Sequence, residues 1–113
     1  MTWKSILVAS KINNKKNIIK LFKSFKKNKD NTFIIDSKLN IKISYNELYY
    51  YSLYLSNFLK KNDIRKGDKI AVNLPNCSEY VIIFFACVFI GAILVPIDYN
   101  LKLNEILKIF KQI

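Results

Sequence analysis

Residues 67–100 decide the fold of this chain, and they read GDKIAVNLPNCSEYVIIFFACVFIGAILVPIDYN. The run 70–74 is short and apolar, as is typical of a buried strand, and Pro75 ends it because proline cannot donate to a sheet. Asn76 is placed to cap the helix that follows. Glu79 lies in the third position after it, where a carboxylate completes a capping box.

The second part of this stretch predicts a helix and another buried strand. The helix extends to about Ile90 and is apolar nearly all round, so other elements must cover it on more than one side. Gly91 suits a left-handed helix end, and the aliphatic run 93–96 is typical of a strand buried on both faces. Together these segments predict one β-α-β unit with parallel strands, and therefore an α/β fold.

The residues before this unit predict a helix, a hairpin and a second helix. Segment 16–28 places its apolar side chains on one face among lysines, a pattern more typical of a surface helix than of a membrane-surface anchor. Segments 32–35 and 41–43 are short β-branched runs on either side of polar turn residues, which indicates a β-hairpin. Ser44 and Glu47 then form a capping box at the start of the next helix.

Two further helical stripes follow from the spacing of apolar residues. The helix after Ser44 has a predicted buried stripe of Leu48, Ser52, Leu55 and Leu59. We interpret the tyrosines beside it as covers of apolar surface rather than stacking platforms for bases: Tyr49, Tyr50, Tyr51 and Tyr54. Segment 103–113 predicts a final short helix. Residues 1–15 show no periodicity, and we expect a loose extension there.

Charge and metal-ligating residues narrow the functional classes. The formal net charge is +11 over 113 residues, but Arg65 is the single arginine. Nucleic-acid-binding domains use the planar fork of arginine more often, so we expect no nucleic-acid partner. The chain has Cys77, Cys87 and no histidine, which is too few ligands for a tetrahedral zinc site and excludes the usual histidine-containing catalytic dyads. The apolar neighbours of Cys87 predict a buried thiol.

An uncharged run at 80–97 has the length of a transmembrane helix. Gly91 and Pro96 interrupt its second half, which is unfavourable for one continuous helix. Glu79 and Asp98 flank it in place of the basic residues expected at a cytoplasmic membrane edge. A membrane span is therefore the less favoured interpretation, and it is not excluded by the sequence.

Several passages occur together in the order and spacing of one family. They are SYNEL at 44–48, GDKIA at 67–71, LPN at 74–76, and Gly91-Ala92 followed by Pro96. Together they resemble the N-terminal segment of the adenylate-forming (AMP-binding) superfamily, which includes acyl-CoA synthetases, luciferases and peptide-synthetase adenylation domains. The resemblance covers about residues 16–113. Residues 76–80 and 90–97 look most like acyl-CoA ligases of the carnitine/crotonobetaine or fatty-acid type.

The resemblance implies a partial N-terminal subdomain of that fold, a hairpin followed by α-β-α-β-α with parallel strands. It also implies a two-step reaction that uses ATP, Mg²⁺ and coenzyme A and proceeds through an acyl adenylate. The family's phosphate loop, ribose-binding acid and late lysine have no counterpart in this sequence. We therefore expect residues 16–113 to be an AMP-binding synthetase segment that stops before the phosphate-binding loop.

No catalytic, cofactor-binding or metal-binding residue is carried over from the family. We expect this segment to bind no cofactor alone, to be inactive alone and, as the resemblance implies, to be cytoplasmic. Two positions depart from the family pattern. Phe89 stands where relatives usually place a lysine or arginine, and Lys102-Leu103 replaces a Thr-Pro start, which leaves the last helix without a good N-cap.

Three interpretations of function remain open. The leading one is a fragment of an acyl-CoA-synthetase-like ligase whose partner is the remainder of the ligase domain. Another is one half of a split ligase that a separate downstream chain completes. The last is a small basic single-pass membrane protein with its span at 80–97. The first two predict exposed apolar surface, because so few strands and helices cannot bury both faces of a sheet.

Overall fold

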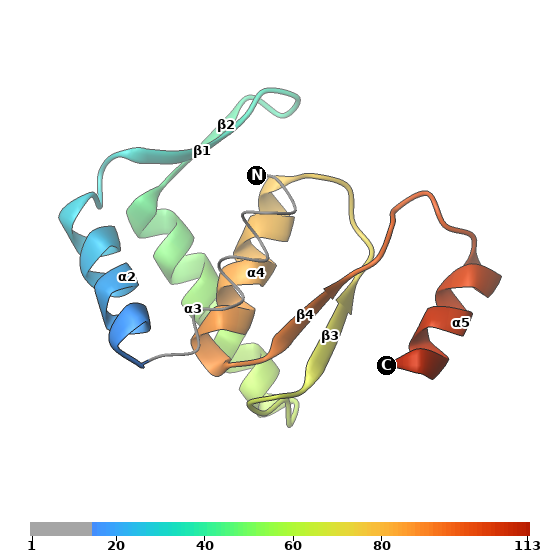
Figure 1. The fold of residues 1–113 in the computed structure, drawn as a ribbon. Helices are drawn as coiled ribbons and strands as arrows, with labels where there is room; N and C mark the ends of the chain where they lie inside the picture. The colour runs from blue at the N-terminus through green and yellow to red at the C-terminus, as the bar shows by residue number, and fades with distance from the viewer. Residues whose placement is uncertain (1–14) are drawn as a thin grey trace.

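The computed structural model describes residues 15–113, in which a hairpin is followed by alternating helices and strands (Figure 1). The elements are α2 (Lys15–Lys27), β1 (Thr32–Asp36), β2 (Ile41–Ser44), α3 (Tyr45–Lys61), β3 (Lys69–Val72), α4 (Ser78–Ile90), β4 (Ile93–Pro96) and α5 (Leu103–Gln112). This order confirms the predicted α/β architecture. The expected loose extension lies outside the described residues, except for Lys15, which begins α2.

The predicted hairpin is confirmed. β1 and β2 pair antiparallel, with Ile34 opposite Ile43 and Asp36 opposite Ile41. Ser44 then starts α3 as predicted: its hydroxyl accepts a hydrogen bond from the Glu47 N–H at 3.1 Å, and Glu47 accepts the Ser44 N–H at 3.3 Å. The reciprocal cap fixes the turn by which the hairpin leads into α3.

β3 and β4 form the predicted parallel pair, in register from Lys69 opposite Ile93 to Val72 opposite Pro96. The prediction that the first strand continues over 70–74 was wrong by two residues. The last bond between the two chain segments is donated by the Ile97 N–H to the Val72 carbonyl, at 2.9 Å. Both strands end at the pair of Val72 and Pro96, so β3 stops before the chain reaches Pro75.

The predicted cap of α4 was also wrong by one residue. α4 begins at Ser78, and Cys77 is its N-cap, with extended backbone and no side-chain cap bond. Asn76 therefore lies outside the capping position. Glu79 is the second helical residue rather than the third, so the capping box predicted from spacing does not form.

The far end of α4 follows the prediction. Gly91 adopts the left-handed conformation, with φ of +73°, and its N–H donates back to the Val88 carbonyl. The uncharged run 80–97 is therefore split between a helix that ends at Ile90 and the separate strand β4. Among the described residues no helix is long and apolar enough to cross a membrane, which contradicts the membrane-span interpretation.

The main interface of the fold is between α3 and α4. Leu48, Ser52 and Ser56 of α3 are almost completely buried, whereas Leu55 and Leu59 of the predicted stripe are only half-buried. The buried stripe of α3 is therefore centred on Ser52 and Ser56 rather than on the leucines that were predicted to lie there. Small side chains allow close approach of a neighbouring helix, and the facing helix α4 buries Ala86 and Cys87 almost completely.

An aromatic cluster joins α2, the hairpin, α3 and α4. It consists of Phe25, Phe33, Tyr45 and Phe85, in edge-to-face pairs with ring centroids 4.8–6.2 Å apart. Such pairs add about 0.5–1.5 kcal/mol each beyond the area that they bury. α2 thus presents Phe25 to the core, whereas the side chains of Lys20, Lys23, Lys26 and Lys27 are exposed.

α5 stands apart from this core (Figure 1). None of its residues is buried, and the Lys69 ammonium donates to the Ile113 carbonyl at 3.3 Å as a link to β3. As expected, α5 lacks a good N-cap, because the side chain of Lys102 has no hydrogen-bond acceptor. Glu105 compensates in part, because its carboxylate accepts the Lys102 N–H at 2.8 Å.

Substitution of Gly91 by alanine should cost more stability than substitution of Gly67. Both glycines have positive φ, +73° and +89°, where an L side chain costs about 1–2 kcal/mol. A Cβ at Gly91 would also lie 2.9 Å from the Lys66 Cγ, whereas one at Gly67 meets nothing within 4 Å. Urea denaturation of Gly91→Ala, Gly67→Ala and the double variant Gly91→Ala/Lys66→Ala measures the difference. Equal losses in all three variants would show that the contact with Lys66 is no constraint.

Candidate functional site

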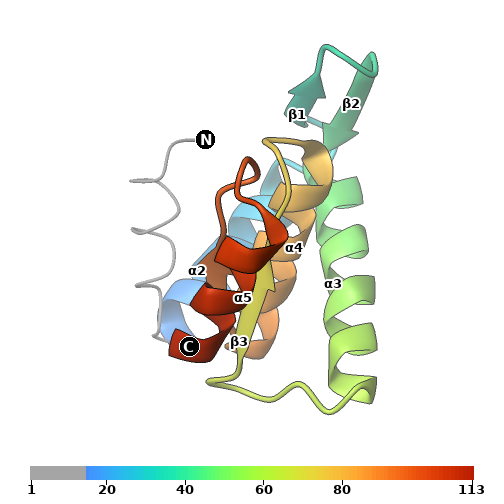
Figure 2. The same ribbon diagram turned by 90° about the vertical axis from the view of Figure 1, so that its right-hand side faces the viewer.

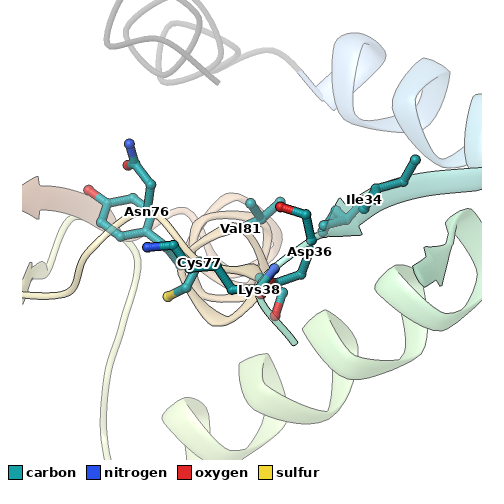
Figure 3. Close-up of a pocket in the computed structure, with 10 residues that line it drawn as sticks. Ile34, Asp36, Lys38, Asn76, Cys77 and Val81 are labelled. Carbon is teal, nitrogen blue, oxygen red and sulfur yellow. The ribbon is translucent and has the colours of Figure 1, made fainter. Parts of the chain in front are cut away.

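A hollow of about 280 Å³ lies between the β1–β2 hairpin and the first turn of α4 (Figure 3). Its walls are residues 34–38 of the hairpin, residues 76–78 before and at the helix start, and Tyr80 and Val81. Two segments distant in sequence therefore meet here. The hollow combines apolar walls with hydroxyl, thiol, amide, carboxylate and ammonium groups.

The Asp36 carboxylate on the hairpin side is already engaged by its own loop. Its Oδ1 accepts hydrogen bonds from the N–H groups of Lys38 and Leu39, at 3.1 and 3.2 Å. This is an Asx turn, in which a short acidic side chain replaces a backbone acceptor. Asp36 thus shapes the hairpin loop, and its structural role accounts for its place in the wall.

The α4 side of the hollow is polar but not activated for covalent chemistry. The pKa of Glu79 is lowered, first by its own backbone N–H and then by the Cys77 side chain. Ser78 donates its hydroxyl to the Glu79 Oε2 at 3.3 Å. Burial is the main cause that raises the pKa of the Cys77 thiol. Since the nucleophile is the thiolate, a raised pKa argues against Cys77 as a reactive cysteine.

The Tyr80 hydroxyl is a buried polar group of the hollow that lacks a hydrogen-bond partner among the described residues. The residue is 7% exposed. Burial raises the pKa of Tyr80, because the phenolate is harder to desolvate than the phenol. A buried hydroxyl without a partner costs about 1–3 kcal/mol. The sequence did not single out this hollow, since no local pattern shows that the hairpin folds over the start of α4.

The described residues contain no group of three or more histidine, cysteine, aspartate or glutamate side chains placed to hold a metal ion. The hollow offers polar groups for binding and no activated acid, base or nucleophile. We assign no catalytic, cofactor-binding or metal-binding residue. The sequence prediction that this segment contributes none stays a prediction.

The arrangement of hairpin, helices and parallel strands is that of the N-terminal subdomain of adenylate-forming enzymes. It matches the N-terminal subdomain of NpsA from Klebsiella oxytoca, solved with anthranilyl-AMSN, with a TM-score of 0.74 and 27% identity. The match covers 81% of this chain and 24% of that one. The family model of the AMP-binding enzymes matches residues 21–113, and the chain belongs to that family.

Two curated relatives are named as a CoA ligase and as a coenzyme A synthetase. The crotonobetaine/carnitine–CoA ligase of Escherichia fergusonii is 44% identical over 62 residues, which are 55% of this chain and 12% of that protein. The acetyl-coenzyme A synthetase of Agrobacterium fabrum is 42% identical over 52 residues, 46% of this chain and 8% of that protein. The chain thus spans a small part of the length of these relatives, and the resemblance stated above is confirmed.

Tyr80→Phe should stabilise the chain. The variant keeps the ring and removes a buried hydroxyl without a partner among the described residues, so we expect a gain of about 1 kcal/mol in the free energy of unfolding. Urea denaturation at neutral pH measures it. Tyr54→Phe is the matched control, because its hydroxyl is on an exposed residue and its loss should change little. A loss of stability in Tyr80→Phe would mean that the hydroxyl is bonded.

The two thiols should differ sharply in reactivity. Cys87 is buried, and burial raises its pKa from 9.0 to about 11, whereas Cys77 is only half-buried. At pH 8 a thiol reagent should modify Cys77 first and Cys87 only after unfolding, as mass spectrometry with Cys77→Ser as control can show. Equal labelling rates of the two thiols would contradict the burial of Cys87.

The raised pKa of Cys87 also makes stability depend on pH, because the folded state favours the protonated thiol. The contribution of the protonated Cys87 thiol to stability is full below pH 9 and is lost as the pH rises from 9 toward 11.

Proposed function

We propose that this chain is the N-terminal part of an ATP-dependent acyl-CoA-synthetase-like ligase. In the complete enzyme a substrate carboxylate attacks the α-phosphorus of ATP, and pyrophosphate leaves. The thiol of coenzyme A then attacks the acyl carbonyl, and AMP leaves. Family membership over residues 21–113 and relatives that are named as CoA ligases and synthetases support this proposal.

The observation that carries the proposal is the incomplete parallel sheet. Within the described residues β3 and β4 pair only with each other, so each strand has an unpaired edge. Parallel strands are normally covered on both faces, and here α4 packs against β4 from one side (Figure 1). Ile93 of β4 is 49% exposed. A two-stranded parallel pair of this kind needs further strands or helices beside it.

α5 presents a second uncovered surface on the side of the strands (Figure 2). Its apolar residues include Leu103, Leu107 and Phe110, all of them exposed. An amphipathic helix gains most of its stability from the packing of its apolar face. We infer that the remainder of the ligase domain packs on α5 and on the open strands, whether it belongs to the same chain or to a separate one.

The cofactors and substrate follow from the same proposal. ATP, Mg²⁺ and coenzyme A bind in the complete domain, and residues 15–113 alone bind none of them and are inactive. The names of the matched relatives favour a carnitine-like or acetyl substrate, and the family resemblance adds a fatty acid as a further candidate. The family resemblance favours a cytoplasmic location.

The first test is the DNA directly downstream of the codon for Ile113. An open frame that encodes a Ser/Thr/Gly-rich loop ending in Lys-Gly is the expected result for a working or split ligase. A stop codon followed by unrelated or broken sequence would make the chain a remnant. That outcome would overturn the proposal of an active complete enzyme.

The second test is adenylation activity. Release of pyrophosphate from ATP and Mg²⁺, with carnitine, crotonobetaine, acetate or a fatty acid, should be absent for this chain alone and present after co-expression with the downstream product. Leu107→Asp on the exposed face of α5 should weaken reconstitution, whereas Lys108→Asp, on the same helix and also exposed, serves as the control. Activity of the chain alone would contradict the proposal that it is inactive without the remainder of the ligase domain.

A further inference from the structure

The outer face of α3 carries a row of exposed aromatic side chains, here called the aromatic ridge. Its members and their exposed fractions are Tyr50 (59%), Tyr51 (49%), Tyr54 (79%) and Phe58 (55%). Spacings of three and four residues place them along one side of the helix. The opposite side is the one that buries Leu48, Ser52 and Ser56. Tyr50 packs edge-to-face on the half-buried ring of Tyr49, with centroids 5.4 Å apart, which fits the interpretation that these tyrosines cover apolar surface. Tyr51 and Tyr54 nevertheless leave about half or more of their surface open to solvent.

The aromatic ridge is separate from the surface that the remainder of a ligase domain would cover. α4 lies between α3 and the strands, and α3 and α5 lie on opposite sides of it (Figures 1 and 2). An element added to the open strands and α5 therefore leaves the ridge exposed. No residue of the ridge lines the hollow at the start of α4.

The charges around the ridge favour an anionic partner. Lys60 and Lys61 end α3, are exposed and form no ion pair among the described residues. The acids on the same element or directly after it are engaged: Glu47 in the capping box, and Asp63 with Arg65 at 3.3 Å. A second copy of the chain would bring the same cations and the same net charge of +11, which disfavours pairing of two ridges.

We propose that the aromatic ridge and its flanking lysines dock on an anionic lipid bilayer. Tyrosine rings bind at the depth of the headgroups, a phenylalanine ring lies at the boundary between headgroups and acyl chains, and lysine stems extend so that their ammonium groups reach lipid phosphates. Binding of this kind scales with the apolar area inserted and with attraction to anionic lipids. The ridge is the convex face of a helix rather than a groove. This proposal does not rest on the proposed enzymatic function.

The experiment is flotation of the full chain with two kinds of vesicle. One contains equal parts of phosphatidylcholine and phosphatidylglycerol, and the other contains phosphatidylcholine alone. We expect binding to the anionic vesicles, and its loss on neutral vesicles or at high salt. Tyr54→Ser/Phe58→Ser and Lys60→Ala/Lys61→Ala should each weaken binding about tenfold or more.

The matched control is Leu103→Ser/Leu107→Ser, which removes two exposed apolar side chains from α5 and should leave vesicle binding unchanged. Circular dichroism checks that every variant retains its helices. Vesicle binding that survives the Tyr54→Ser/Phe58→Ser change, or that is lost in the α5 variant instead, overturns the proposal. It is also overturned if light scattering shows a dimer that the ridge substitutions abolish, because the ridge then pairs copies of the chain.

Discussion

The constraint on which this structure depends is the need to cover α4 on several sides. The helix is apolar nearly all round, and seven of its thirteen residues are buried. α3 covers one side through its buried serines, and the aromatic cluster around Phe25 and Phe85 adds α2 and the hairpin. The strands pack against a further side, where β4 returns along the helix that precedes it. Most of the other elements are therefore arranged around this one hydrophobic helix.

The features that were predictable from the sequence are those decided within a few residues. The Ser44–Glu47 box depends on one hydroxyl and one carboxylate three positions apart, and the structure contains both bonds. Gly91 ends α4 because a left-handed residue is needed at that point, and glycine adopts it at no steric cost. Within the described residues, the order of elements follows from such local signals together with the change from helical to alternating periodicity.

The features that the sequence did not predict depend on distant partners. β3 ends where its pairing with β4 ends, at Val72 opposite Pro96, and not at Pro75 as the local signal predicted. The burial of Ser52 and Ser56 in α3 depends on the close approach of α4, and a hydropathy pattern carries no information on that approach. The hollow at the start of α4 exists because the hairpin folds over Cys77, and nothing in either segment alone indicates that meeting.

The two sides of α4 differ in how far their apolar residues are buried. One cluster of buried residues holds α2, the hairpin, α3 and α4 together, and it includes Phe25, Ile43, Leu48, Phe84 and Phe85. Among the apolar residues of β3, β4, α5 and the loops beside these elements, only Val72 and Ile97 are buried. Burial of apolar area contributes roughly 25 cal/mol per Å² to stability. The hairpin side of α4 therefore has a core of its own, whereas the strand side depends on whatever packs against β3, β4 and α5. The segment therefore has a packed core on one side of α4 and exposed apolar surface on the other, which fits a chain that covers only part of the adenylation-domain fold.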